Sequence, residues 1–241
     1  MSIAAWLAKA GKYQIEQIGG IPHFNLAVDL AGPRTGIEHT TEKGKGASDE
    51  AGWNGALSVF RQHYAPHFIV GAGRIGQLVQ IGTLSGACVS NNVHAIVEIE
   101  VVADSDTALW LPDDPTLDAL ASLLAACQQE YGIPLAHPWP DGDFGRAGDN
   151  PHRHVGKFGV VAGWYGHADV PSVPGHPPET HWDPGNLRWS VVLDRARGML
   201  DILHAPATIA GPLPPRPCCI APPGAPVAVL GAPTGGAGLS K

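Results

Sequence analysis

A run of β-branched and apolar residues, HAIVEIEVVA at positions 94–103, constrains the fold of this 241-residue chain more than any other segment. An uninterrupted run of this kind is typical of a central strand. The run carries two acids, Glu98 and Glu100, which point to the same face because side chains alternate along a strand. Acids in so apolar a strand need partners, which favours a functional site over the alternative of solubilising charges at a sheet edge.

Helical segments are expected to flank this strand. The clearest lies in DDPTLDALASLLAACQQEYGIP, where Asp114 suits the N-cap, Pro115 suits the first helical position and Gly132 ends the helix. Its leucines recur at helical spacing and form the stripe to be buried. Further helix candidates are residues 2–10, 48–62 and 186–200, and a hairpin candidate spans residues 67–82 with its turn at 71–73.

The remaining segments set the domain organisation. The segment 137–165 is rich in Gly, Pro and His, so a long loop is expected there, and its HxH pair, His152 and His154, is expected on the surface or against a substrate. Beyond about residue 205, Pro and Gly are too dense to support a packed core. The prediction is one α/β domain over residues 1–205, with a mixed central β-sheet flanked by helices, followed by a Pro/Gly-rich tail or linker over residues 206–241.

Composition argues against two classes of partner. The formal net charge is −7 with only 15 Lys and Arg, which is unsuited to binding nucleic acid through its phosphates. No apolar run approaches the roughly 18 residues needed to cross a membrane, and no basic region precedes the short apolar patch at the N-terminus, so no signal peptide is predicted. The 12 His favour a metal or hydrolytic site, because imidazole is the commonest metal ligand and the usual general acid/base.

Four side chains that could bind a metal lie within GHADVPSVPGHPPETHWDPG at positions 166–185: His167, His176, His181 and Asp183. A catalytic zinc needs about three protein ligands and an open position for water. His167 and Asp183 lie on turns bounded by prolines, and His39, at the predicted end of a strand in TGIEHTTEKG, is the best third candidate. Each also has an ordinary alternative: a strand His is commonly a core or surface residue, and an Asp before Pro-Gly commonly makes a turn. His176 is expected in a solvated loop.

Five segments in order carry a family resemblance: IEHTTEKG, APHFIVGAGRIGQLVQ, AIVEIEVVA, LASLLAACQQEYGIPL, and GWYGHADVP followed by HWDPG. Over residues 35–195 the chain resembles zinc-dependent N-acetylmuramoyl-L-alanine amidases of type 2, which share the peptidoglycan-recognition-protein fold and include many bacteriophage endolysins. The resemblance implies that His39, His167 and Asp183 hold Zn2+. It also implies that the protein cuts peptidoglycan between the lactyl group of N-acetylmuramic acid and L-alanine, and that it is made in the cytoplasm and acts on the cell wall after release.

The resemblance assigns further roles near the zinc site. Glu100 would act as the general base, with Glu98 as the alternative, and His181, at a position that is often Lys in the family, would stabilise the oxyanion. His67 and Trp164 are candidates for lining the substrate cleft, with core packing as the equal alternative for each. Two other functions stay open: a peptidoglycan-binding module of the same fold that has lost catalysis, and a zinc amidase that acts on another acyl-peptide.

Overall fold

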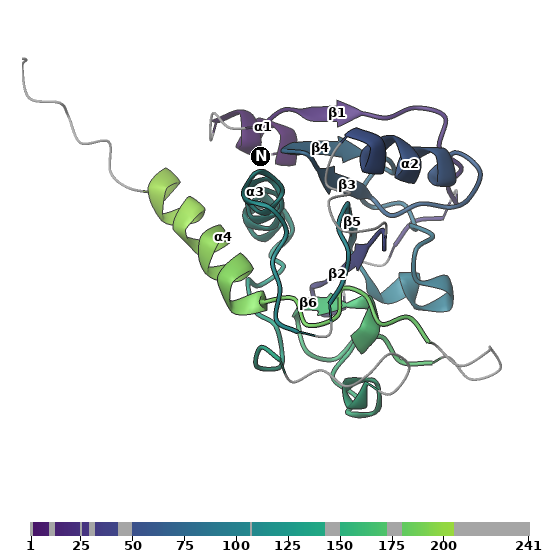
Figure 1. Ribbon diagram of the computed structural model, residues 1–241, viewed down its shortest axis with the longest axis vertical. Helices are drawn as coiled ribbons and strands as arrows, with labels where there is room; N and C mark the ends of the chain where they lie inside the picture. Colours follow the sequence, from purple (N-terminus) through teal and green to yellow (C-terminus); the bar gives the residue numbers. More distant parts are fainter. Residues whose placement is uncertain are drawn as a thin grey trace, which may run out of the picture. The chain divides into compact units, whose positions relative to one another are not determined.

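In the computed structural model, the described residues are 2–9, 13–24, 26–28, 32–42, 50–106, 108–142, 150–172 and 180–204. A six-stranded sheet forms the centre of this described part, in the order β1 (Ile15–Gln17), β4 (Arg74–Gln77), β3 (Phe68–Gly71), β5 (Val97–Val101), β2 (Thr35–Thr40) and β6 (Gly163–Gly166). The β3–β4 hairpin is antiparallel, and the other pairs in this sheet are parallel. The sheet is therefore mixed, as predicted, and the acidic strand β5 lies inside it (Figure 1).

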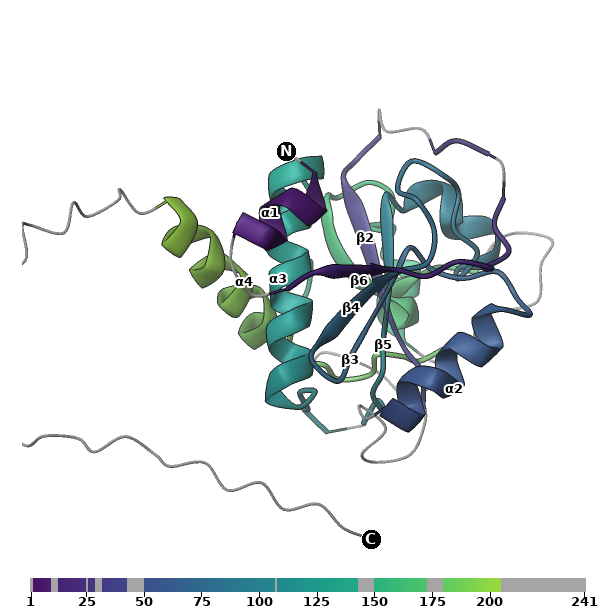
Figure 2. The ribbon, with the colours of Figure 1, turned by 90° about the horizontal axis from the view of Figure 1, so that it is seen from above.

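Helices cover both faces of the sheet. On one face, α3 (Asp114–Tyr131) packs against β3, β4 and β5, and it also contacts α1 (Ile3–Lys9) and α4 (Trp189–His204). The opposite face is covered by α2 (Glu50–Phe60), which lies across the sheet from α3 in both views (Figures 1 and 2). The predicted arrangement of a central sheet flanked by helices is confirmed.

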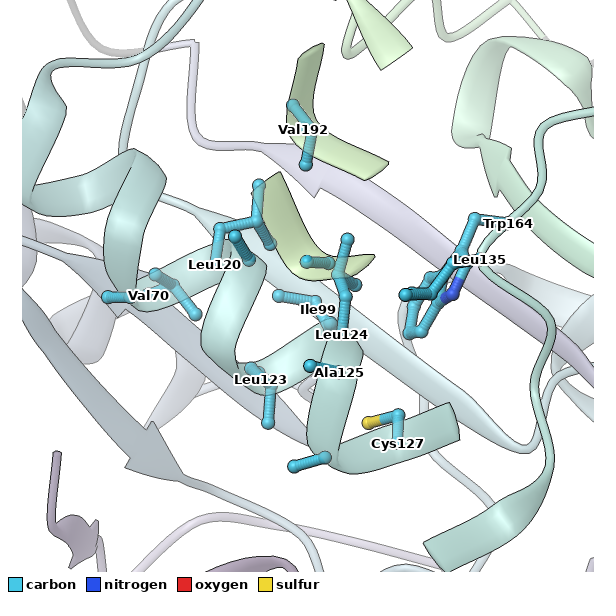
Figure 3. Close-up of a cluster of buried hydrophobic side chains, with 14 of the residues drawn as sticks. Val70, Ile99, Leu120, Leu123, Leu124, Ala125, Cys127, Leu135, Trp164 and Val192 are labelled. Carbon is cyan, nitrogen blue, oxygen red and sulfur yellow. The ribbon is translucent and has the colours of Figure 1, made fainter. Parts of the chain in front are cut away.

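The strand β5 divides its side chains between the two faces. Val97, Ile99 and Val101 belong to the core cluster that α3 builds, and Figure 3 shows Ile99 among the side chains of this cluster. Burial of each such side chain contributes roughly 1.5–3 kcal/mol, so the register of β5 is strongly specified. Because side chains alternate along a strand, Glu98 and Glu100 point to the opposite face, the one on which α2 packs.

The helix α3 begins and ends at local sequence signals. Its N-cap is Asp113, whose carboxylate accepts a backbone N–H of the first turn at 2.9 Å. The prediction of Asp114 as the cap was therefore wrong by one residue. Gly132 follows the last turn with φ of 69°, a left-handed conformation that Gly adopts without a steric penalty.

The prediction of a loop over residues 137–165 was wrong for two stretches. The strand β6 begins at Gly163, and the 3-10 turn η2 spans Pro151–His154. The strand is short and begins and ends with Gly, so its own sequence carries little strand signal. Its pairing with β2 depends instead on a close tertiary fit. A Cβ atom added to Gly36 of β2 would lie 2.3 Å from the ring of Trp164 in β6, so only Gly allows the two strands to pack this way.

The C-terminal helix starts later than predicted. It begins at Trp189 rather than at 186, because residues 186–188 run alongside Trp110 and exchange backbone hydrogen bonds with it. By its internal contacts, the chain from Met1 to Ala205 forms one compact unit. The predicted tail, 206–241, lies outside the described residues and stays a prediction. In the described part of the chain, no helix is both long enough and apolar enough to cross a membrane.

Candidate metal centre

The strand β2 positions the first predicted ligand. His39 is the fifth of the six residues of β2, all of which are buried. In the parallel pairing of β2 with β5, its partner is Glu100, so the two side chains share the sheet face opposite α3. Both residues lie near the carboxyl ends of their strands, which is the edge of a sheet where α/β proteins bind ligands.

The other two predicted ligands come from segments that follow β6 and precede α4. His167 is the residue directly after β6, which runs parallel to β2, so its ring lies beside the ring of His39. Hydrogen bonds tie Asp183 to the segment after β6 and to β2. Its backbone carbonyl accepts the N–H of Ala168 at 2.8 Å, and its carboxylate accepts the N–H of Thr40 at 3.3 Å.

These three side chains converge on one point. The Nδ1 atoms of His39 and His167 are 3.0 Å apart, and each lies 3.6 Å from a carboxylate oxygen of Asp183. All three residues are at most 5% exposed. A tetrahedral zinc site with ligands at 2.0–2.1 Å has ligand–ligand separations of about 3.3 Å. Two imidazoles and a carboxylate at these distances therefore fit a zinc ion.

A cysteine that was not singled out from the sequence also reaches this centre. Cys88 precedes the 3-10 turn η1 (Val89–His94), and its Sγ lies 3.6 Å from Nε2 of His39. Among the described residues, His39, Cys88 and His167 form a group whose ligand atoms lie within 4.8 Å of one another. No sequence motif marks Cys88, because it reaches the centre only through the packing of the segment around η1 against β2.

The protonation states favour the ligand set of His39, His167 and Asp183 over the set in which Cys88 takes the place of Asp183. Burial, and next the nearby His167, lowers the pKa of His39 to about 4, so its imidazole is neutral at pH 7. Burial alone would raise the pKa of Asp183, but the imidazoles around it outweigh that effect and hold its pKa well below the usual value. Burial raises the pKa of the Cys88 thiol to about 12, so it keeps its proton. A metal binds neutral imidazole and carboxylate without removing a proton, whereas a thiol must first be deprotonated.

Both strand acids are buried beside the centre. Burial, and next the charge of Asp183, raises the pKa of Glu100 well above the ordinary carboxylic value. Burial raises the pKa of Glu98 to about 7, and one of its oxygens accepts the N–H of Ala87 at 3.2 Å. In the register with β2, Glu100 is level with His39, whereas Glu98 lies two residues deeper. This placement favours Glu100 as the acid that meets the reacting groups.

A third buried acid was not singled out from the sequence. Glu38 is fully buried on the sheet face opposite to that of its neighbour His39, and among the described residues neither of its carboxylate oxygens has a hydrogen-bond partner. Burial, and next the charge of Asp183, raises the pKa of Glu38 to about 8, so it is mostly protonated at neutral pH. A neutral acid avoids most of the cost of burying an unpaired charge.

His181 lies at the open side of the centre. Its side chain is 62% exposed, its Nδ1 is 3.5 Å from a carboxylate oxygen of Asp183, and its ring stacks on that of His167 with centroids 4.3 Å apart. One side of the ring thus contacts the ligands while much of the side chain faces solvent. This position suits a group that reaches a substrate.

Two residues proposed as cleft-lining lie in the interior instead. His67 is fully buried, its Nδ1 accepts the N–H of Glu98 at 3.0 Å, and its Nε2 donates to the carbonyl of Thr83 at 3.0 Å. Trp164 is also fully buried and packs beside Leu135 in the α3 core (Figure 3). Core packing, the alternative considered for each, is what this geometry favours.

The two histidines of the HxH pair have different environments. His154 is exposed, whereas His152 is buried and stacks on Trp139, with ring centroids 4.0 Å apart. A surface position, one of the two alternatives expected for this pair, is therefore wrong for His152, because η2 turns its ring inward. The prediction for His176 lies outside the described residues.

Comparison with known proteins gives similarity to solved structures only, since no protein-family model and no curated protein matches this chain. The hydrolase AmiA of Staphylococcus aureus is 18% identical, with 83% of this chain and 91% of that chain covered and a TM-score of 0.49. The N-acetylmuramoyl-L-alanine amidase LysC of Clostridium intestinale is 11% identical, with 76% and 97% covered and a TM-score of 0.42. The Drosophila peptidoglycan recognition protein SD is 14% identical, with 74% and 93% covered and a TM-score of 0.45. Because these TM-scores lie below 0.5, the function proposed next rests on the residues of the site and on the sequence resemblance.

Proposed function

We propose that this protein is a zinc-dependent N-acetylmuramoyl-L-alanine amidase that hydrolyses the amide between the lactyl group of N-acetylmuramic acid and L-alanine in peptidoglycan. The observation that carries the proposal is the convergence of His39, His167 and Asp183 from three distant segments, with mutual distances of 3.0–3.6 Å beside a buried glutamate. The substrate follows from the sequence resemblance. The same resemblance supports a role on the cell wall after release from the cytoplasm, as for a phage endolysin.

The residues of the centre divide the chemistry among them. His39, His167 and Asp183 would hold Zn2+, which when bound supplies a Lewis acid that polarises the amide carbonyl and acidifies a water molecule. Glu100 takes the proton of the attacking water and passes it to the nitrogen of the leaving amine. Burial, and next the charge of Asp183, raises the pKa of Glu100, which favours the protonated form that the second step needs. His181 donates a hydrogen bond from its exposed ring to the oxyanion that develops on the carbonyl.

Digestion of purified peptidoglycan with and without a chelator tests this proposal. Zinc-loaded protein should release new L-alanine amino groups, and the chelator should stop the release. His39→Ala and His167→Ala should lose zinc and activity together, whereas Glu100→Gln should keep zinc and lose kcat by about 10²–10⁴-fold. Glu98→Gln is the matched control, because it removes a neighbouring buried acid on the same strand face.

The outcomes separate the alternatives. Full activity in Glu100→Gln with loss of activity in Glu98→Gln would assign the base to Glu98. Binding of muropeptides by zinc-loaded protein without any turnover would instead support a binding module. Cleavage of other acyl-peptides, with no L-alanine ends released from peptidoglycan, would support a zinc amidase of different specificity. Retention of activity after complete removal of the metal would refute the proposed mechanism.

A further inference from the structure

A buried arginine joins the two segments that carry the metal ligands His167 and Asp183. Arg153, in η2, is only 5% exposed. Its Nε donates to the backbone carbonyl of Ala168 at 2.8 Å, and its Nη2 donates to the backbone carbonyl of His181. Ala168 directly follows the ligand His167, and His181 lies two residues before the ligand Asp183. One guanidinium therefore bridges the segment after β6 and the segment before α4.

The turn that carries this arginine is itself anchored to the first of these segments. Asn150 donates from Nδ2 to the carbonyl of Ala168 at 2.9 Å and to the carboxylate of Asp169 at 3.0 Å. His152 donates from Nδ1 to the same carboxylate at 2.8 Å, and Asp169 also accepts the N–H of Gly166 at 2.8 Å. These bonds hold η2 against residues 166–169. The backbone of Arg153 is therefore fixed relative to the first segment, and its guanidinium extends from there to the second segment.

The geometry suits arginine and not lysine. A guanidinium is planar, always charged, and presents its donors in a rigid fork, so it can hold two carbonyls at a set separation. An ammonium group has one donor centre on a flexible stem and cannot hold both carbonyls in the same directions. Hydrogen bonds from a charged donor are about twice as strong as neutral ones. The bridge is therefore strong enough to influence how the two segments lie relative to each other.

Other interactions also hold the second segment at the centre. A direct backbone bond from Ala168 to the carbonyl of Asp183 at 2.8 Å joins the two segments at the ligand itself. The His181 side chain is mostly exposed and contacts the centre through its stacking on His167 and its approach to Asp183. The bond from Arg153 acts on the backbone of His181, two residues before the ligand Asp183, and so constrains the backbone from which the His181 ring extends.

We propose that Arg153 is a positioning residue of the metal centre, which sets the separation of His167 from Asp183 and the placement of the His181 ring. The effect on metal affinity and turnover rests on the proposed zinc amidase function. The effect on the two backbone segments does not, because the bridge joins two backbone carbonyls and uses none of the side-chain atoms that would hold the metal. Partners that orient metal ligands typically change affinity or activity by 10–100-fold when they are replaced.

The test uses Arg153→Lys in the full-length protein, with Arg153→Met as a second variant that keeps the apolar stem without the charge. Arg197→Lys is the matched control, because Arg197 also donates from Nη2 to a backbone carbonyl, that of Leu135, in a different part of the fold. Four measurements are made: zinc affinity by competition with a chromophoric chelator, the visible spectrum of the cobalt(II)-loaded protein, hydrogen exchange of the Ala168 amide in metal-free protein, and the kinetics of muropeptide cleavage.

Arg153→Lys should weaken zinc binding by about 10–100-fold, lower the intensity of the cobalt(II) bands and speed exchange at Ala168 by at least about 10-fold. On muropeptides, kcat should fall by a similar factor with KM changed less than about threefold, because the substitution acts on the segments that carry the ligands. Arg153→Met should show the same changes to a larger extent. Arg197→Lys should leave all of these quantities within about twofold.

The proposal is overturned if Arg153→Lys matches the unsubstituted protein within twofold in zinc affinity, cobalt spectrum and Ala168 exchange. A loss confined to thermal stability in both Arg153 variants would likewise overturn it, since that is the result for a purely structural arginine. If the unsubstituted protein binds zinc but cleaves no muropeptide, the proposed function fails while affinity and exchange still decide the role of Arg153. If the protein binds no zinc, the exchange rate decides whether the bridge exists, and the role in metal binding is refuted.

Discussion

Replacing His67 by Gln should flatten the loss of stability that this protein undergoes between pH 7 and pH 4. The His67 ring is fully buried, with Nδ1 accepting the N–H of Glu98 and Nε2 donating to the carbonyl of Thr83. Burial lowers the pKa of His67 from 6.5 to about 4. A proton on Nδ1 would also displace the hydrogen bond from Glu98, so the folded state holds this imidazole in its neutral form.

The sign and size follow from proton linkage. The unfolded chain binds a proton at His67 as the pH falls through 6.5, whereas the folded chain does so only near pH 4. The stability that the neutral imidazole contributes is therefore complete above pH 6.5 and is lost as the pH falls through the folded pKa of about 4. At 1.36 kcal/mol per pH unit, the interval of about 2.5 units corresponds to about 3 kcal/mol, most of which is lost by pH 4.5.

Urea unfolding of the metal-free protein and of His67→Gln, at pH values from 7.5 to 4.5, measures this effect. Gln offers an NH2 group as donor and a carbonyl oxygen as acceptor, so it can keep both hydrogen bonds without titrating. At pH 7.5 the variant should be the less stable by about 1–2 kcal/mol, because its fit is imperfect. The difference should shrink, and reverse, as the pH falls. His39 has a similarly low pKa but is present in both proteins, so its contribution cancels. Parallel stability curves across this range would refute the reasoning.

Three further predictions concern packing, capping and the metal. Gly36→Ala should lower the free energy of unfolding in urea by about 1–3 kcal/mol or more, because the new Cβ would meet the ring of Trp164 at 2.3 Å. Gly55→Ala, its control in α2, places the new Cβ with no atom within 4 Å and should raise the free energy of unfolding by about 0.5–1 kcal/mol. Asp113→Ala should cost about 1 kcal/mol through loss of the α3 cap, and a comparable loss in the matched variant Asp114→Ala would contradict the cap assignment. Zinc at 100 times its Kd should raise the Tm by roughly 5–10 °C in calorimetry, and an unchanged Tm would contradict the metal centre.

The elements that could be predicted from the sequence are those with signals inside one segment. The apolar run of β5 and the proline and glycine that bracket α3 are local features, so the strand and the helix are where they were expected. The N-cap was placed one residue late because both Asp113 and Asp114 have a suitable side chain, and only the hydrogen bond to the first turn distinguishes them. The strand β6 was missed because its short, glycine-flanked sequence forms a strand only when β2 lies beside it.

The candidate site also combines residues that could be predicted from the sequence with residues that only tertiary packing brings there. The resemblance singled out His39, His167 and Asp183, and the structure brings them within 3.6 Å of one another. No pattern in the sequence marked the neighbouring Cys88 or the buried Glu38, since the closeness of Cys88 and the burial of both arise from packing between segments far apart in the chain. The roles considered for His67 and Trp164 likewise depended on which way each side chain points.

By itself, the sequence determined the residue types that a metal centre needs and the local elements that carry them: two imidazoles, carboxylates in an apolar strand, and turns closed by proline and glycine. Only the tertiary structure decided which of these groups meet, which are buried and which protons they keep. One physical reason is that hydrogen-bond register and packing join β2, β5 and β6, which together span more than a hundred residues along the chain. A second reason is that burial shifts the pKa values of His39, Glu98 and Glu100, and no single segment determines that burial. Arg153 follows the same rule, because an arginine in a His-rich turn becomes a bridge only where two backbone carbonyls from distant segments face it.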